Sequence, residues 1–149
     1  MPRRFQGIVR AVRSNDGTSE LDPERDYIKQ QIRQFIEFVA RLLGIEQTAR
    51  EIEQARMDLA TAAEAVLGSP ADAFDRLSAS SAAGMLQEPE RVRAYAVYCA
   101  ALGELAYREG RLEAAEVQDR RAMQLYRWIL DLFPDDPQAN QALDGLGRR

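Results

Sequence analysis

The feature that most constrains the fold is a pair of long helical segments joined at a glycine and ended by a proline. The segments cover about residues 90–109 and 112–133, with Gly110 at the turn and Pro134 at the stop. Apolar residues recur every three or four positions in both, which is typical of amphipathic helices. Each segment carries two such stripes, and a helix that is apolar on two faces needs two neighbours. We therefore expect these helices to be central elements of a bundle.

The stripes also identify the residues expected in the core. In the first segment they are Val92, Tyr95, Ala96, Cys99, Leu102 and Ala106, and then Tyr98, Ala101 and Leu105. In the second they are Leu112, Ala115, Ala122, Tyr126, Ile129 and Phe133, interrupted by Asp119, and then Val117, Leu125, Trp128 and Leu132.

Two further amphipathic helices precede this pair. One begins at Asp22, a good N-cap followed by proline, and ends near Gly44. The next covers about 45–67, has several alanines in its apolar stripe, and is closed by Gly68 and a following proline. Alanine-rich stripes allow close helix packing.

The remaining segments predict shorter elements. Residues 70–89 begin and end with proline and contain three closely spaced serines, so we expect short helices or loops there, with Ser80 or Ser81 as the cap of a segment over 82–87. A final short helix over about 136–146 has Asp136 as its N-cap. No alternation with period two stands out after residue 20, so the predicted fold class is all-α, a compact bundle of five to six helices.

The predicted domain organisation is an N-terminal arm over residues 1–20 followed by one all-α domain over 21–149. The arm carries basic residues with no acid before Asp16: Arg3, Arg4, Arg10 and Arg13. They are candidates for contact with an acidic partner, nucleic acid or an anionic membrane surface. The alternative is a loosely packed tail, which is common at chain termini.

Composition argues against most enzyme classes. The chain has no histidine and one cysteine, which removes Ser–His and Cys–His pairs and the usual zinc sites. Cys99 lies in an apolar run and is predicted to be a buried structural thiol. No phosphate-binding loop is present, and we expect no catalytic, cofactor or metal site. The net charge of −4 argues against general nucleic-acid binding.

The central hairpin resembles a tetratricopeptide (TPR) repeat. Leu102 and Gly103 match the large-then-small pair of the first helix, Gly110 the turn, and Ala115 the small residue of the second helix. The sequence departs from the family where Asp119 replaces a large apolar residue. In outline, the resemblance implies a hairpin over about 90–134 and a capping helix over about 136–146. A wider likeness, over 22–146, is to a group of small uncharacterised bacterial helical proteins.

The TPR resemblance also implies a ligand-facing surface on the first helix. The matching positions are Val97, Ala100, Glu104, Tyr107 and Arg108. Alternatively, Val97 and Ala100 pack against the preceding helices, since apolar helical positions are usually core.

The sequence thus predicts a non-catalytic protein-binding or scaffold module, whose partner is another protein or a second copy of the chain. One alternative is a bundle that holds an apolar small molecule among its aromatic side chains: Tyr95, Tyr98, Tyr126 and Trp128. Another is a regulator whose basic arm contacts nucleic acid. No segment reaches the roughly 18–20 apolar residues of a membrane span, and we expect a cytoplasmic bacterial protein.

Overall fold

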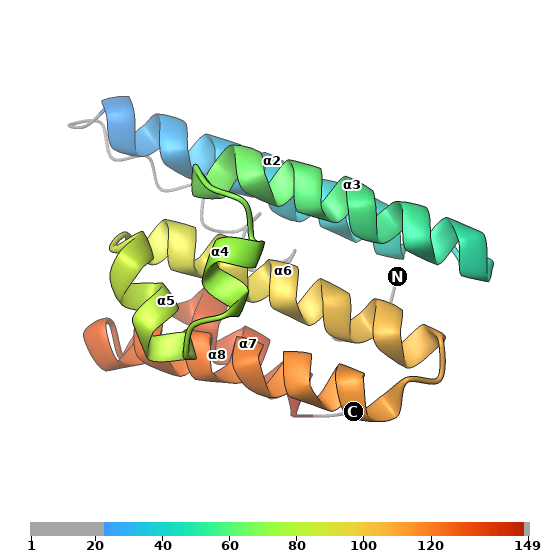
Figure 1. The fold of residues 1–149 in the computed structure, drawn as a ribbon. Helices are drawn as coiled ribbons and strands as arrows, with labels where there is room; N and C mark the ends of the chain where they lie inside the picture. The colour runs from blue at the N-terminus through green and yellow to red at the C-terminus, as the bar shows by residue number, and fades with distance from the viewer. Residues whose placement is uncertain (1–22, 148–149) are drawn as a thin grey trace.

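The computed structural model describes residues 23–147, and these form an all-helical bundle without strands (Figure 1). The predicted basic arm lies outside the described residues, as does the Asp22 cap. The described residues contain seven helices, because the broken segment forms two short helices of its own. The helices are α2 (Pro23–Leu43), α3 (Ala49–Leu67), α4 (Asp72–Asp75), α5 (Ala79–Leu86), α6 (Pro89–Arg108), α7 (Leu112–Leu132) and α8 (Pro137–Leu146).

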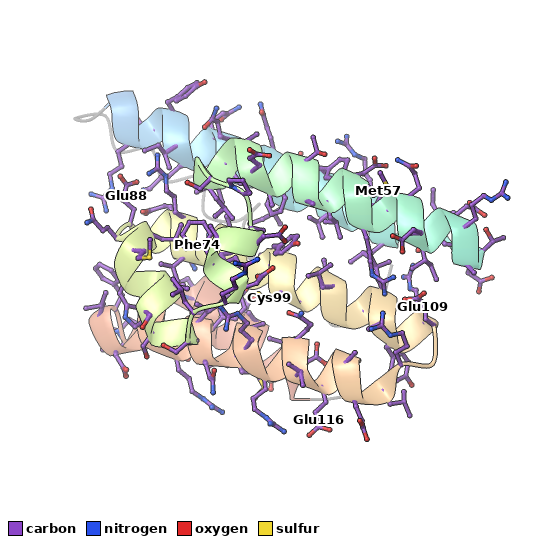
Figure 2. All side chains as sticks on the ribbon, viewed as in Figure 1. Met57, Phe74, Glu88, Cys99, Glu109 and Glu116 are labelled. Atoms are coloured by element: carbon purple, nitrogen blue, oxygen red, sulfur yellow. The ribbon has the colours of Figure 1, made fainter. Side chains whose placement is uncertain are left out.

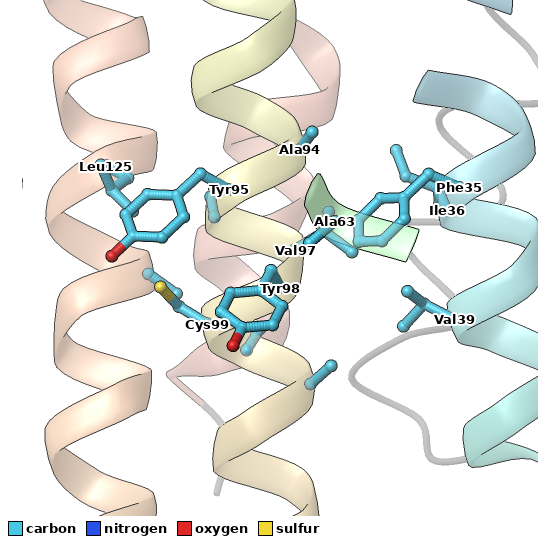
Figure 3. Packing of buried hydrophobic residues seen from close by; sticks show 14 of the residues in the cluster. Phe35, Ile36, Val39, Ala63, Ala94, Tyr95, Val97, Tyr98, Cys99 and Leu125 are labelled. Carbon is cyan, nitrogen blue, oxygen red and sulfur yellow. The ribbon is translucent and has the colours of Figure 1, made fainter. Parts of the chain in front are cut away.

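Helix α6 is the centre of the bundle. It contacts α2 and α3 on one side and α7 on the other, and α5 packs near its beginning (Figure 1). Every residue from 92 to 101 is buried, as expected for a helix that is apolar all round. Figure 3 shows Val97 directed towards Phe35 and Ile36 of α2, whereas Tyr95 lies on the side of Leu125 in α7. The prediction of a central helix with neighbours on two faces is confirmed for α6.

Helix α3 is bounded by a local capping signal at each end. Helix α3 begins at Thr48, whose side chain accepts a hydrogen bond from the Glu51 N–H while the Glu51 carboxylate accepts one from Thr48, a capping box. It ends at Gly68, whose φ of 79° lies in the left-handed region that favours glycine. The helix therefore starts four residues later than the predicted position 45.

The segment between α3 and α6 differs from its prediction in one detail. Ser78 caps α5, because its hydroxyl accepts a hydrogen bond from the Ser81 N–H at 3.1 Å. The predicted caps, Ser80 and Ser81, lie inside that helix. A run of serines offers several good caps, and Ser78 is the one that lets Ala79, Ala82, Ala83 and Leu86 all face the core.

A polar cluster joins α4, α6 and α7 across the core. The Tyr95 hydroxyl donates to Asp75 at 2.6 Å, and Arg121 donates to the Tyr95 hydroxyl at 3.0 Å and to the Phe74 carbonyl at 2.6 Å. Desolvation raises the pKa of Asp75, although the hydrogen bond from Tyr95 and the charge of Arg121 oppose the shift. Arg121 therefore reaches inward from α7 and holds the short helix α4.

The beginning of α6 is held to the beginning of α8 by an ion pair. Both terminal nitrogens of Arg93 donate to the two carboxylate oxygens of Asp136, at 3.0 and 2.8 Å. Asp136 also caps α8 by accepting from the Ala139 N–H at 2.9 Å, as predicted. Burial alone would raise the pKa of Asp136, but the hydrogen bonds from Arg93 and the backbone outweigh it and lower the pKa.

This pair predicts a pH-dependent stability. Folding lowers the pKa of the Asp136 carboxyl, so the ionised carboxylate stabilises the fold at pH values above its ordinary pKa of 3.8. This contribution is lost as the pH falls through the folded-state pKa. Asparagine is also a good N-cap, so Asp136→Asn removes the charge and keeps the helix start. We expect it to lower the free energy of unfolding by about 1.5–3 kcal/mol at pH 7, and by much less below pH 3.

Urea unfolding at pH 7, 5 and 2 measures this difference. Asp135→Asn is the control, because Asp135 is exposed and its change should stay within about 0.5 kcal/mol. A cost for Asp136→Asn that does not change with pH would contradict a role for the charge.

Candidate protein-binding groove

An open groove runs along about the first three quarters of α7. It has a volume of about 650 Å³ and is bounded by the end of α6 at Tyr107 and the end of α8 at Leu146. The α7 residues that line it follow one helix face: Leu112, Ala115, Glu116, Asp119, Arg120, Met123, Gln124 and Arg127.

The groove exists because α8 is shorter than the helix it packs against. At 1.5 Å per residue, the 21 residues of α7 extend about 32 Å and the 10 residues of α8 about 15 Å. Since α8 runs back along α7 from the turn at residues 133–136, it covers the carboxyl-terminal half of α7 (Figure 1). The amino-terminal half is left uncovered on the same side.

Large apolar side chains are exposed at the open end of the groove. Leu112 is 61% exposed and Tyr107 is 48% exposed, whereas Met123 is partly buried against the core. Leu112 was predicted to lie in the core stripe of its helix, and so was Val117, which is also exposed. Their periodicity is that of a buried face, but no described helix covers this part of α7.

Charged residues form the rim and part of the floor. Glu116 and Arg120 make an ion pair at 2.8 Å, and both side chains are well exposed, so the pair contributes little to stability. Glu116 projects from α7 away from the rest of the bundle (Figure 2). Asp119 is different, because it is buried in the floor beside Gly103 of α6.

Gly103 and Asp119 fit one another at the crossing of α6 and α7. A Cβ added to Gly103 would overlap Oδ1 of Asp119 and would lie 3.3 Å from the carbonyl oxygen of Ala115. Glycine is therefore needed for a steric reason. Asp119 stands where the TPR pattern has a large apolar residue, and here its carboxylate occupies the space that a side chain at Gly103 would use.

The predicted ligand-facing residues do not form one surface. Val97 and Ala100 are fully buried in the core, and Glu104 is also buried, with Oε1 accepting from Arg108 Nε at 3.4 Å. Only Tyr107 lies at the groove. The face of α6 that the TPR resemblance assigns to a ligand is covered by α2 and α3 of the same chain.

Arg108 donates hydrogen bonds to the loop between α2 and α3. Its Nη1 donates to the carbonyl of Ile45 at 3.1 Å and to Oε1 of Gln47 at 2.8 Å. Its Nη2 donates to the carbonyl of Leu43, the last residue of α2, and so satisfies a carbonyl at that helix end. The guanidinium thereby ties the α2–α3 loop to the end of α6.

The aromatic residues considered for a small-molecule site belong mostly to the core. Tyr95, Tyr98 and Tyr126 are buried, and Trp128 packs against the core while partly exposed. None of the four lines the groove. A smaller pocket of about 230 Å³ between α2 and the turn before α8 also contains none of them, and its wall mixes basic and acidic side chains.

Cys99 has the environment of a structural thiol, as predicted. It is fully buried, and burial raises its pKa to about 12, so the thiol stays protonated at neutral pH. Among the described residues, no group of three or more His, Cys, Asp or Glu side chains could hold a metal ion. Within the same residues, no helix has the length and apolar character needed to cross a membrane.

Sequence reasoning missed most of the groove residues. Met123, Gln124 and Arg127 carried no signal, because their exposure depends on where α8 ends. The sequence did show that Asp119 interrupts the apolar stripe of this helix, and Asp119 lies in the groove floor.

Comparison with known proteins gave no match to a family model, to a curated protein or to a solved structure.

The fit between Gly103 and Asp119 can be tested by adding one methyl group. Gly103→Ala should lower the free energy of unfolding by about 1–3 kcal/mol, because the new Cβ overlaps the carboxylate. In an Asp119→Ala background the same substitution should cost clearly less. Urea unfolding of the four proteins gives this coupling as a double-mutant cycle.

Gly84→Ala is the matched control for helix propensity. Nothing lies within 4 Å of a Cβ at Gly84 in α5, so that change should stabilise by about 0.4–1 kcal/mol. Equal costs for Gly103→Ala in both backgrounds would show that Asp119 is not the obstacle.

Proposed function

We propose that this protein is a non-catalytic protein-binding module whose binding site is the groove along α7. The observation that carries the proposal is the uncovered face of α7, where exposed Leu112 and Tyr107 stand beside a floor of Ala115, Asp119 and Met123. Clustered large apolar side chains with a polar rim are typical of protein interaction surfaces. The α6–α7 hairpin serves as a TPR-like element in this proposal, in a cytoplasmic bacterial protein.

The shape of the groove favours a helix as the bound element. Its α7 residues extend from Leu112 to Arg127, which corresponds to about 22 Å along a helix axis. A bound helix of about 15 residues would match that length and would continue the layer that α8 begins. Its apolar positions would contact Leu112 and Met123, and its polar positions would meet the charged rim.

The side chains of the groove support binding better than catalysis. They include carboxylates and guanidinium groups, but neither a thiol nor an imidazole. The one cysteine is buried elsewhere with a raised pKa, which keeps it from acting as a nucleophile.

Site-specific crosslinking in the native organism tests the groove as the binding site. A photoreactive phenylalanine analogue at Leu112 should crosslink to a partner chain, because this side chain would lie in the interface. The matched control is Met57 on α3, which is exposed to a similar extent, 58% against 61%, but lies away from the groove (Figure 2).

The expected result is a discrete adduct at position 112 that is absent at position 57. The adduct should disappear when Met123→Glu places a charge in the floor of the groove. No adduct at Leu112, or equal adducts at both positions, would contradict the proposal.

A further inference from the structure

The charges along the groove are arranged in two opposite halves. Towards the beginning of α7 the lining carries Glu116, with Asp119 in the floor, and towards the end it carries Arg120 and Arg127. The change of sign falls between Asp119 and Arg120, near the middle of the lined stretch. A partner that complements this surface needs a basic half and an acidic half in the reverse order.

The same face of a second α7 has that arrangement when the two helices are antiparallel. A two-fold axis between Asp119 and Arg120 brings two copies of α7 together in antiparallel orientation. In that register each lining position of α7 meets another lining position. Leu112 meets the partner's Arg127 and Glu116 meets the partner's Met123, whereas Asp119 stays buried beside Gly103, below the axis.

We infer that the helix bound in the groove is α7 of a second copy of this chain, in a symmetric antiparallel pair. The inference rests on the proposed function of the groove and names its partner. A two-fold interface must be complementary to itself, and the reversal of charge along α7 supplies this property.

The contacts in this register are favourable on chemical grounds. Glu116 would lie opposite Met123, one helical turn from the partner's Arg120 on one side and from the partner's Arg127 on the other. Leu112 would lose its exposure by packing against the aliphatic stem of Arg127. Each of these contacts occurs twice, because the axis relates the two copies.

Sedimentation equilibrium of the full chain over a range of concentrations tests the pairing. The wild type should give a monomer–dimer equilibrium. Glu116→Arg brings like charges together at both ends of the interface, and so does Arg127→Glu. Each should raise the dimer dissociation constant by roughly tenfold or more, most strongly at low salt.

Mixing the two variants gives the decisive measurement. A Glu116→Arg chain carries only basic residues at positions 116 and 127, and an Arg127→Glu chain carries only acidic ones. An equimolar mixture should therefore form heterodimers at concentrations where each variant alone is monomeric. Glu64→Arg on the exposed face of α3 has the same change of charge and should leave the wild-type equilibrium unchanged.

Circular dichroism of each variant establishes that it is folded, and Glu116→Gln provides a milder variant that should weaken the dimer less than the reversal. A wild-type chain that stays monomeric, or a mixture that fails to pair, would overturn the inference. If the monomeric chain still crosslinks from Leu112 to a different protein, the groove remains the binding site and only the identity of the partner is wrong. If Leu112 crosslinks to nothing, the proposed function fails as well.

Discussion

The burial of α6 on every side is the constraint on which the other elements depend. Ten consecutive residues, 92 to 101, are buried, so α2 and α3 must cover one side and α7 the other. Small residues make this possible, because alanine and glycine let neighbouring helices approach α6 closely. The cost is that polar groups on this helix are shielded from water, so each needs a hydrogen-bond partner from a neighbouring element.

The polar residues of α6 accordingly hold the other helices in place. Arg93 pairs with Asp136 at the start of α8, Tyr95 joins Asp75 and Arg121, and Arg108 binds carbonyls at the end of α2. Of these side chains, Arg108 is one that the TPR resemblance assigned to a ligand. Because α6 uses these side chains internally, the proposed binding surface lies on α7.

How much of this could be predicted from the sequence depends on the range of the interaction. Periodicity and end signals placed the long helices, the turn at Gly110 and the buried Cys99, because these follow from local spacing. Periodicity also marked Val117 and Leu132 as core, yet both are exposed, because a stripe shows which face is apolar and not how far a neighbour extends along it. Arg121 lay on that same stripe, four residues after Val117, and its inward position follows from partners on α4 and α6.

The groove itself follows from a difference in helix length that no local pattern reports. α8 ends after ten residues, so it covers only part of α7, and the exposed remainder keeps the apolar spacing of a buried face. The floor of that remainder is closely packed, because Asp119 fills the space beside Gly103 where α6 and α7 cross. A surface with fixed backbone spacing loses little conformational entropy when it binds. In the proposed function, the helix that stops early and the glycine that allows close packing therefore have the same consequence, a preformed surface suited to a second helix.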